Sequence, residues 1–120
     1  MKKLTKKRSI ELCLELWTWL AENPGNRKRD WPEWNKYGDA DSYCFACEYV
    51  RQHRSILQTE WSCKKCPLIA LWGEHKGNDP CTQNEESPYY LWVESGCGDT
   101  KSAKKIATYC RKLLKNMEKK

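Results

Sequence analysis

The sequence predicts a mainly α protein that folds as a single domain over residues 1–120. Two observations lead to this fold class. Segments near both ends of the chain repeat apolar residues at i, i+3, i+4 and i+7, which is the spacing of one face of an α-helix. The length also suits one compact domain and not two. Only 39% of the residues are hydrophobic and 32% are charged, so the aliphatic supply for a core is small, and seven Trp and six Tyr supplement it.

The first predicted helix covers about residues 5–22. Thr5 or Ser9 can cap its start, and the run Asn23-Pro24-Gly25-Asn26 ends it, because proline cannot donate to the helix ladder and glycine tolerates a left-handed turn. Its main apolar stripe consists of Ile10, Cys13, Leu14, Trp17, Leu20 and Ala21. A second stripe lies to one side and consists of Leu12, Leu16 and Trp19. The two stripes together are wider than the surface that one partner helix covers, so we expect the second stripe to form a protein interface.

The central part of the chain is predicted to be less regular. Residues 26–43 form a polar connection, and the two tryptophans of Trp31-Pro32-Glu33-Trp34 are expected to pack this loop onto the core. Residues from about 46 to 54 can be helical, and 55–62 form a turn or a short strand of a β-hairpin. A short helix follows from Pro67, since proline is favoured at the first helical position.

Two helices are predicted after the centre. Ser87-Pro88 starts a short helix over residues 89–94, with serine as the cap and a glycine after its end. Asp99 or Thr100 caps the last helix, about residues 101–118. We expect this helix to pack against the first one through its apolar stripe, which consists of Ala103, Ile106, Ala107, Cys110, Leu113, Leu114 and Met117.

Charge is distributed unevenly along the chain. Residues 1–8 contain five basic and no acidic side chains, and residues 101–120 contain eight basic and one acidic, whereas residues 9–100 contain nine basic and fifteen acidic. The net charge of +6 therefore combines basic ends with an acidic body. Basic ends can bind nucleic acid by neutralising phosphates, although a solvated helix face is a more common reason for such charge. The candidates for phosphate contact lie on the polar side of the last helix: Lys104, Lys105, Arg111, Lys112 and Lys115.

Four cysteines form two pairs, Cys44-x2-Cys47 and Cys63-x2-Cys66, with fifteen residues between them. Two thiolates at this spacing can chelate one ion from a single turn, and two such pairs complete a tetrahedron without an open coordination position. Thiolate ligands favour zinc over ions that prefer oxygen. We therefore expect one structural zinc ion per chain, held by a module over about residues 44–81 that supplies much of the folding free energy.

Other arrangements of the cysteines stay open. Cys81 lies fifteen residues after Cys66 and can replace one member of the quartet. A disulfide framework is the main alternative to zinc and a redox-active Cys-x-x-Cys is a second, but no export signal is visible and disulfides are rare in reducing compartments. Cys13 and Cys110 lie on the apolar stripes of the two long helices, where we expect them to pack as small apolar side chains.

No catalytic constellation is visible in the sequence. The chain has two histidines, no His-Glu-x-x-His and no Gly-x-Ser-x-Gly, and a four-thiolate zinc site has no open position for water. We therefore expect a non-enzymatic protein, and a nuclease is the less favoured alternative. The basic N-terminal residues are not followed by the apolar segment of a signal peptide, so we expect a cytoplasmic protein. No apolar run approaches the roughly 20 residues that span a bilayer, so we expect no membrane-spanning helix and no membrane partner.

The cysteine segment and the residues after it resemble a known kind of protein. The runs Cys44-Phe-Ala-Cys47-Glu-Tyr and Cys63-Lys-Lys-Cys66-Pro-Leu68, then Cys81, then Ser87-Pro-Tyr89 with Trp92, are similar to small Cys-rich proteins encoded by tailed bacteriophages. The resemblance covers residues 44–93, about half of the chain. It implies a phage accessory protein that acts in the cytoplasm of the bacterial host and binds zinc, and it implies no reaction.

Two functions follow from these observations. The first is a non-enzymatic accessory protein that binds a host macromolecule, such as a defence protein, and modulates or inhibits it. The seven Trp support this function, because tryptophan is enriched in interface hot spots, and so does the wide apolar face of the first helix. The alternative is a nucleic-acid-binding zinc-finger protein that uses the basic terminal helices, although the acidic body argues against a large duplex footprint.

Overall fold

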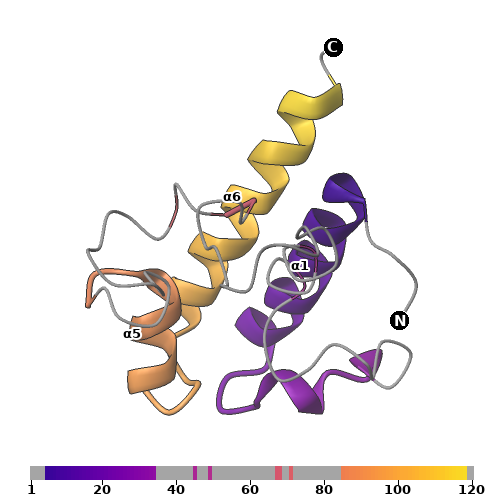
Figure 1. Cartoon of the computed structure of the whole chain (residues 1–120). Coiled ribbons are helices and arrows are strands. Elements are labelled where there is room, and N and C mark those ends of the chain that lie inside the picture. The colour runs from indigo at the N-terminus through magenta and orange to yellow at the C-terminus, as the bar shows by residue number, and fades with distance from the viewer. Residues whose placement is uncertain are drawn as a thin grey trace, which may run out of the picture.

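The computed structural model describes residues 5–34, 45, 49, 67, 68, 71 and 85–118, and this part of the chain is mainly α, as predicted. It contains the helices α1 (Lys6–Glu22), α5 (Pro88–Glu94) and α6 (Thr100–Glu118), and a short 3-10 turn, η1 (Lys28–Asp30) (Figure 1). No strand occurs in these ranges. The predicted hairpin lies outside the described residues, and so does the predicted helix over 46–54 apart from Tyr49, which has helical backbone.

Helix α1 begins and ends where the sequence predicts. Of the two candidate caps, Thr5 is the one in place, because its Oγ1 accepts a hydrogen bond from the backbone N–H of Arg8 at 3.0 Å. Ser9 lies inside the helix, where its Oγ donates to a backbone carbonyl three residues earlier at 2.7 Å. The chain leaves the helix at Asn23, and Gly25 follows with a φ of +89°, a left-handed conformation that glycine adopts without strain.

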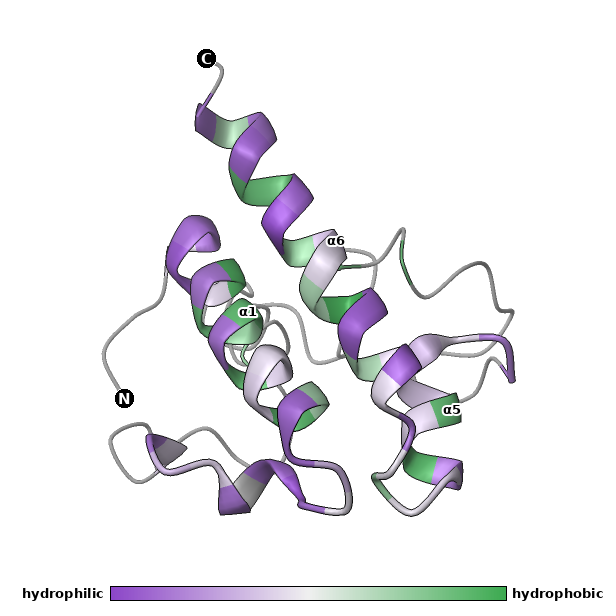
Figure 2. Ribbon diagram, turned by 180° about the vertical axis from the view of Figure 1, so that it is seen from behind, coloured by the Kyte–Doolittle hydropathy of each residue, from purple (hydrophilic) through white to green (hydrophobic). Residues whose placement is uncertain are grey.

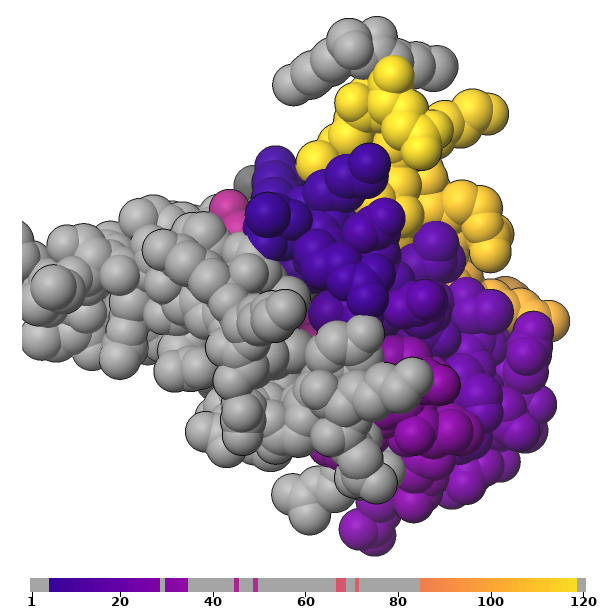
Figure 3. All heavy atoms as spheres, turned by 90° about the vertical axis from the view of Figure 1, so that its right-hand side faces the viewer, coloured from indigo at the N-terminus to yellow at the C-terminus, as the bar shows by residue number. Residues whose placement is uncertain are grey.

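The packing of α1 against α6 forms the centre of the described structure. The two helices lie side by side and run in opposite directions (Figures 1 and 2), and their atoms lie against each other in the space-filling view (Figure 3). Cys13 and Cys110 are fully buried free thiols, which confirms their predicted place in the core. The buried residues are Ser9, Ile10, Leu12, Cys13, Leu16, Trp17, Leu20 and Ala21 on α1, and Ser102, Ala103, Ile106, Ala107 and Cys110 on α6.

The apolar face of α1 is covered over most of its width. Leu12 and Leu16, from the second stripe, are fully buried, and Trp19 is partly buried against the core. The structure therefore places the two leucines inside the molecule, and not on the exposed protein interface that the sequence predicts. The physical reason is that α6 is not the only apolar neighbour of α1, because the same core includes three residues from segments between α1 and α5: Trp31, Phe45 and Leu68.

Aromatic side chains fill the core where aliphatic ones are few. Trp17 of α1 meets Trp92 of α5 edge to face, with ring centroids 4.8 Å apart and ring planes at 80°. Tyr89 makes a second edge contact with Trp17 at 5.8 Å. Trp31 is buried and lies edge to face with Phe45 at 6.0 Å, which confirms that the loop after α1 packs onto the core. Pairs with this geometry contribute about 0.5–1.5 kcal/mol each beyond the area that they bury.

Hydrogen bonding joins the turns that follow α1 and α5. Helix α5 begins at Pro88, as predicted, with Ser87 at the N-cap position, but the Ser87 side chain makes no capping hydrogen bond. Gly96 follows the end of the helix with a φ of +72°. Cys97 also has a positive φ, +67°. Its carbonyl accepts a hydrogen bond from the backbone N–H of Gly25 at 2.8 Å, so the two turns are held together at one end of the helices.

Replacing Leu16 tests whether the second stripe of α1 belongs to the core. Because Leu16 is fully buried, we expect Leu16→Ala to lower the free energy of unfolding, measured by urea denaturation, by about 2–5 kcal/mol. The matched control is Glu15→Ala at the neighbouring exposed position, which we expect to change the same quantity by less than about 0.5 kcal/mol. A loss for Leu16→Ala as small as that of the control would contradict the burial of this stripe.

Candidate nucleic-acid interface

Helix α6 contains a row of positively charged side chains. Between Thr100 and Met117 the sequence has six basic and no acidic residues. Five of them are the residues that the sequence analysis selected, and Lys101 was missed because it lies in the first turn, at the edge of the predicted helix. All six are exposed: Lys101, Lys104, Lys105, Arg111, Lys112 and Lys115. We call this set the basic face of α6.

The basic face lies opposite the side of α6 that is buried. At 3.6 residues per turn, its six members fall within an arc of about 120° around the helix axis. Ala103, Ile106 and Cys110 are fully buried on the other side, where α6 packs against α1 and α5. The ribbon coloured by hydropathy shows hydrophilic and hydrophobic positions alternating along α6 (Figure 2). Packing of the core therefore determines that the basic side chains point into solvent.

Asp99 fixes the point at which α6 begins. Its Oδ1 accepts a hydrogen bond from the backbone N–H of Ser102 at 3.1 Å, and its Oδ2 accepts one from the Ser102 hydroxyl at 2.8 Å. These two bonds lower the pKa of Asp99, the bond from the hydroxyl more than the bond from the backbone, and the nearby Lys101 lowers it further. Of the two predicted caps, Asp99 is therefore the one in place, and the turn that contains Lys101 is held in helical form.

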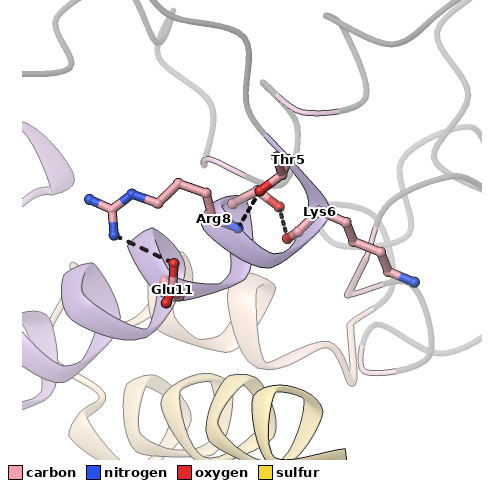
Figure 4. A network of polar contacts seen from close by, with 5 residues as sticks. Thr5, Lys6, Arg8 and Glu11 are labelled. Atoms are coloured by element: carbon pink, nitrogen blue, oxygen red, sulfur yellow. Dashed lines mark hydrogen bonds and ion pairs between the residues drawn. The ribbon is translucent and has the colours of Figure 1, made fainter. Parts of the chain in front are cut away.

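The basic first turn of α1 lies at the same end of the molecule as the C-terminal half of α6, since the two helices are antiparallel (Figures 1 and 2). Lys6 and Lys7 are exposed there. Arg8 is 3.7 Å from the Glu11 carboxylate, and the side chain of Lys6 extends away from this pair (Figure 4). A surface pair of this kind contributes at most about 1 kcal/mol. The two basic ends of the sequence thus add to each other's positive potential at one end of the fold.

Most exposed acidic side chains of the described residues lie outside α6, and Glu118 is the one acidic residue of α6, at its C-terminal end. Glu15 on α1 is exposed, and so are Glu85 before α5 and Glu94 at its end. The negative charge of Glu94 raises the pKa of the Tyr90 hydroxyl, with smaller contributions from desolvation and from Glu85. The acidic body expected from the sequence is therefore represented on α1 and around α5, whereas the exposed side of α6 is basic.

The predicted metal ligands Cys44, Cys47, Cys63 and Cys66, and the substitute Cys81, lie outside the described residues. In the part of the chain that the structure describes, no group of three or more His, Cys, Asp or Glu side chains can hold a metal ion. Two neighbours of the cysteine pairs are described, however. Phe45 and Leu68 are both fully buried in the core that includes α1, so the chain beside each pair is anchored to the same core.

Comparison with known proteins gives no relative: no protein-family model, no curated protein and no solved structure matches the chain. Within the described ranges, no helix has both the length and the apolar character needed to cross a membrane.

The cap of α6 makes stability depend on pH. Because the pKa of Asp99 is lower in the folded protein than its ordinary value of 3.8, the contribution of the cap is present above pH 3.8 and is lost as the pH falls through the folded pKa. We expect Asp99→Ala to lower the free energy of unfolding by about 1 kcal/mol at neutral pH. The difference from the unsubstituted protein should shrink at about pH 2.

Asp99→Asn is the matched control for this prediction. Asparagine keeps an oxygen that can accept the hydrogen bonds of the cap but has no charge to titrate, so this variant should retain most of the stability at neutral pH. Urea unfolding of the three proteins at both pH values measures the effect. Equal stability of Asp99→Ala and the unsubstituted protein at neutral pH would contradict the assignment of Asp99 as the cap.

Proposed function

We propose that the chain is a non-enzymatic nucleic-acid-binding protein that uses the basic face of α6 as its binding surface. The observation that supports this function is the arrangement of the six basic side chains, which are all exposed and share one side of a helix. No ion pair joins any of them to another described residue. Their charge is therefore available to an anionic ligand.

The arrangement of charge on α6 opposes the stability of the helix itself. Lys101 and Lys105 are spaced i, i+4, and so are Arg111 and Lys115. Like charges at this spacing destabilise a helix by about 0.2–0.5 kcal/mol per pair, whereas acidic residues at some of these positions would have stabilised it. A polyanion removes this repulsion, and the release of counterions from nucleic acid adds favourable free energy. A nucleic-acid ligand therefore gives a physical reason for a row of cations without interspersed carboxylates.

A protein partner is less well supported by the described residues. Leu12 and Leu16, the predicted interface residues, are buried. The exposed large apolar side chains of the described part are Leu91 and Val93 on α5, with 43% and 45% of their surface exposed. Two side chains supply much less area than the roughly 800 Å² per partner of an ordinary protein interface.

We also propose that the cysteine pairs bind one zinc ion per chain and act as a structural module. The spacing of Cys44-x2-Cys47 and Cys63-x2-Cys66 supports this, because four thiolates complete a closed tetrahedral site. The burial of Phe45 and Leu68 in the core with α1 is a further support, because a metal beside these residues would stabilise the whole fold. The resemblance to small phage proteins is consistent with such a site and with action in a bacterial cytoplasm.

Neutralising two members of the basic face tests the nucleic-acid role. If all six cations contact phosphates, a plot of log affinity against log salt concentration should have a slope of about −5. In Lys105→Gln/Lys112→Gln, two contacts are removed, so the slope should become less steep by about 2 and the affinity at about 0.1 M salt should fall at least about tenfold. Fluorescence anisotropy with labelled oligonucleotides, in a series of salt concentrations, measures both quantities.

The control for this experiment removes the same charge elsewhere. Arg27→Glu also lowers the net charge by two, but at an exposed position outside both α6 and the basic first turn of α1, so the slope should stay within about 1 of the unsubstituted protein. Lys28 is left unchanged because its Nζ donates to the Tyr89 hydroxyl at 2.8 Å. No binding at low salt, or equal losses in Lys105→Gln/Lys112→Gln and in the control, would contradict the proposed function.

Metal analysis and chelation test the zinc proposal. We expect about one zinc per purified chain, and loss of helical circular dichroism when a strong chelator removes it. Cys63→Ser should lower the metal content and the stability, whereas Cys97→Ser, at a partly exposed free thiol in the turn after α5, should change neither strongly. A metal-free protein whose cysteines resist alkylation until a reductant is added would instead indicate disulfides.

A further inference from the structure

We infer that the basic face of α6 binds the phosphate backbone of a nucleic-acid duplex without reading its base sequence, an inference that rests on the nucleic-acid role proposed above. The charge of the basic face alone does not determine whether the ligand is a duplex or a single strand. Three properties of α6 lead to this inference: the length and rigidity of the row of cations, the chemical types of the exposed side chains, and the position of the neighbouring aromatic residue.

The row of cations has the length of a short duplex contact. From Lys101 to Lys115 the helix rises by about 21 Å, at 1.5 Å per residue. The phosphates of both strands of a duplex together occur about every 1.7 Å along its axis, so a row of this length extends along about six base pairs and can face phosphates of both strands. Ala103, Ile106 and Cys110 are fully buried in the core behind the first part of the row, so this part of the helix is held in place by packing. A regular, rigid duplex suits such a row better than a flexible strand.

The exposed side chains of α6 are suited to phosphates and poorly suited to bases. Between Lys101 and Lys115, the exposed residues are lysines, Arg111 and Thr108. Lysine acts mainly as a point charge toward phosphate, and phosphate contacts contain no direct information on sequence. Asn116, exposed directly after Lys115, is the one amide side chain of α6 of the kind that recognises adenine, and it lies beyond the end of the row. Arg111 is then the one residue of the row with the planar group that commonly recognises guanine.

The row also has no exposed aromatic side chain on which unpaired bases can stack. Proteins that bind single strands usually supply such side chains, and each stacked base contributes about 1–3 kcal/mol. Tyr109 is the aromatic residue of α6, and it is partly buried and packed against the core. Single strands would therefore bind the basic face through charge alone. Their charge density is lower than that of a duplex, which weakens the electrostatic attraction.

The exposed acidic side chains on α1 and around α5 limit the contact to one side of the protein. Glu15 and Glu94 are exposed on these neighbouring helices and repel phosphates that approach there. A contact of about six base pairs on one side of a duplex avoids this repulsion, whereas a strand wrapped around the protein does not. The acidic body is thus compatible with a duplex ligand as long as its footprint is small.

The test compares four labelled ligands of equal length with the full chain: two DNA duplexes of unrelated sequence, one rich in G·C and one in A·T, and one single strand from each. We expect the two duplexes to bind within about threefold of each other and the single strands at least about fivefold more weakly at the same salt concentration. Arg111→Lys keeps the charge but not the planar fork, so it should change binding to both duplexes by the same small factor.

The outcomes separate this inference from the proposed function. Tighter binding to single strands, a preference of more than about tenfold for one duplex sequence, or an effect of Arg111→Lys on the G·C-rich duplex alone would overturn the duplex-backbone inference and leave nucleic-acid binding in place. No binding to any of the four ligands at low salt would overturn both. The Lys105→Gln/Lys112→Gln variant should weaken both duplexes equally, and an unequal effect would count against recognition of the backbone alone.

Discussion

Burial of the apolar stripe of α6 against α1 leaves one side of α6 in solvent, and that side is basic. The same contact accounts for several features of the molecule. It encloses Cys13 and Cys110, and it gives the aromatic residues of α5 a surface to pack on through Trp17. Because the two helices are antiparallel, it also brings the basic start of α1 to the end of α6 that contains Arg111 and Lys115 (Figure 1). Basic residues that lie far apart in the sequence, in the first turn of α1 and in the C-terminal half of α6, therefore lie at the same end of the fold.

Local patterns predict the helices well, because their causes lie within a few residues. Apolar spacing predicts α1 and α6, and Thr5 and Asp99 mark their starts by hydrogen bonds that span three residues. The same spacing places five of the six basic side chains on one side of α6. It does not reveal what covers Leu12 and Leu16, because the additional core residues Trp31, Phe45 and Leu68 come from distant parts of the chain. A wide apolar stripe therefore indicates several neighbours, and these can all belong to the same chain.

The role of the tryptophans is also difficult to predict from the sequence. Their number suggests an interface when only composition is considered, since tryptophan is enriched in binding hot spots. In the structure, Trp17, Trp31 and Trp92 are buried, and edge-to-face contacts with other rings account for their positions. A chain with few aliphatic residues needs large side chains to fill its core. The spacing of the cysteines, by contrast, is a pattern whose meaning depends on residues that come together only in the folded protein, and zinc binding therefore stays a prediction.

The separation of α1 and α6 in the sequence has a consequence for synthesis. Residues 23–99 are made between the two helices, which takes about 4–15 s at the usual 5–20 residues per second. During this interval α1 has left the ribosome while α6 does not yet exist, so the side of α1 that packs against α6 is accessible to other chains and to chaperones. A core built from the first and the last helix of the described structure thus forms late in translation, and the cell must tolerate an uncovered α1 until then.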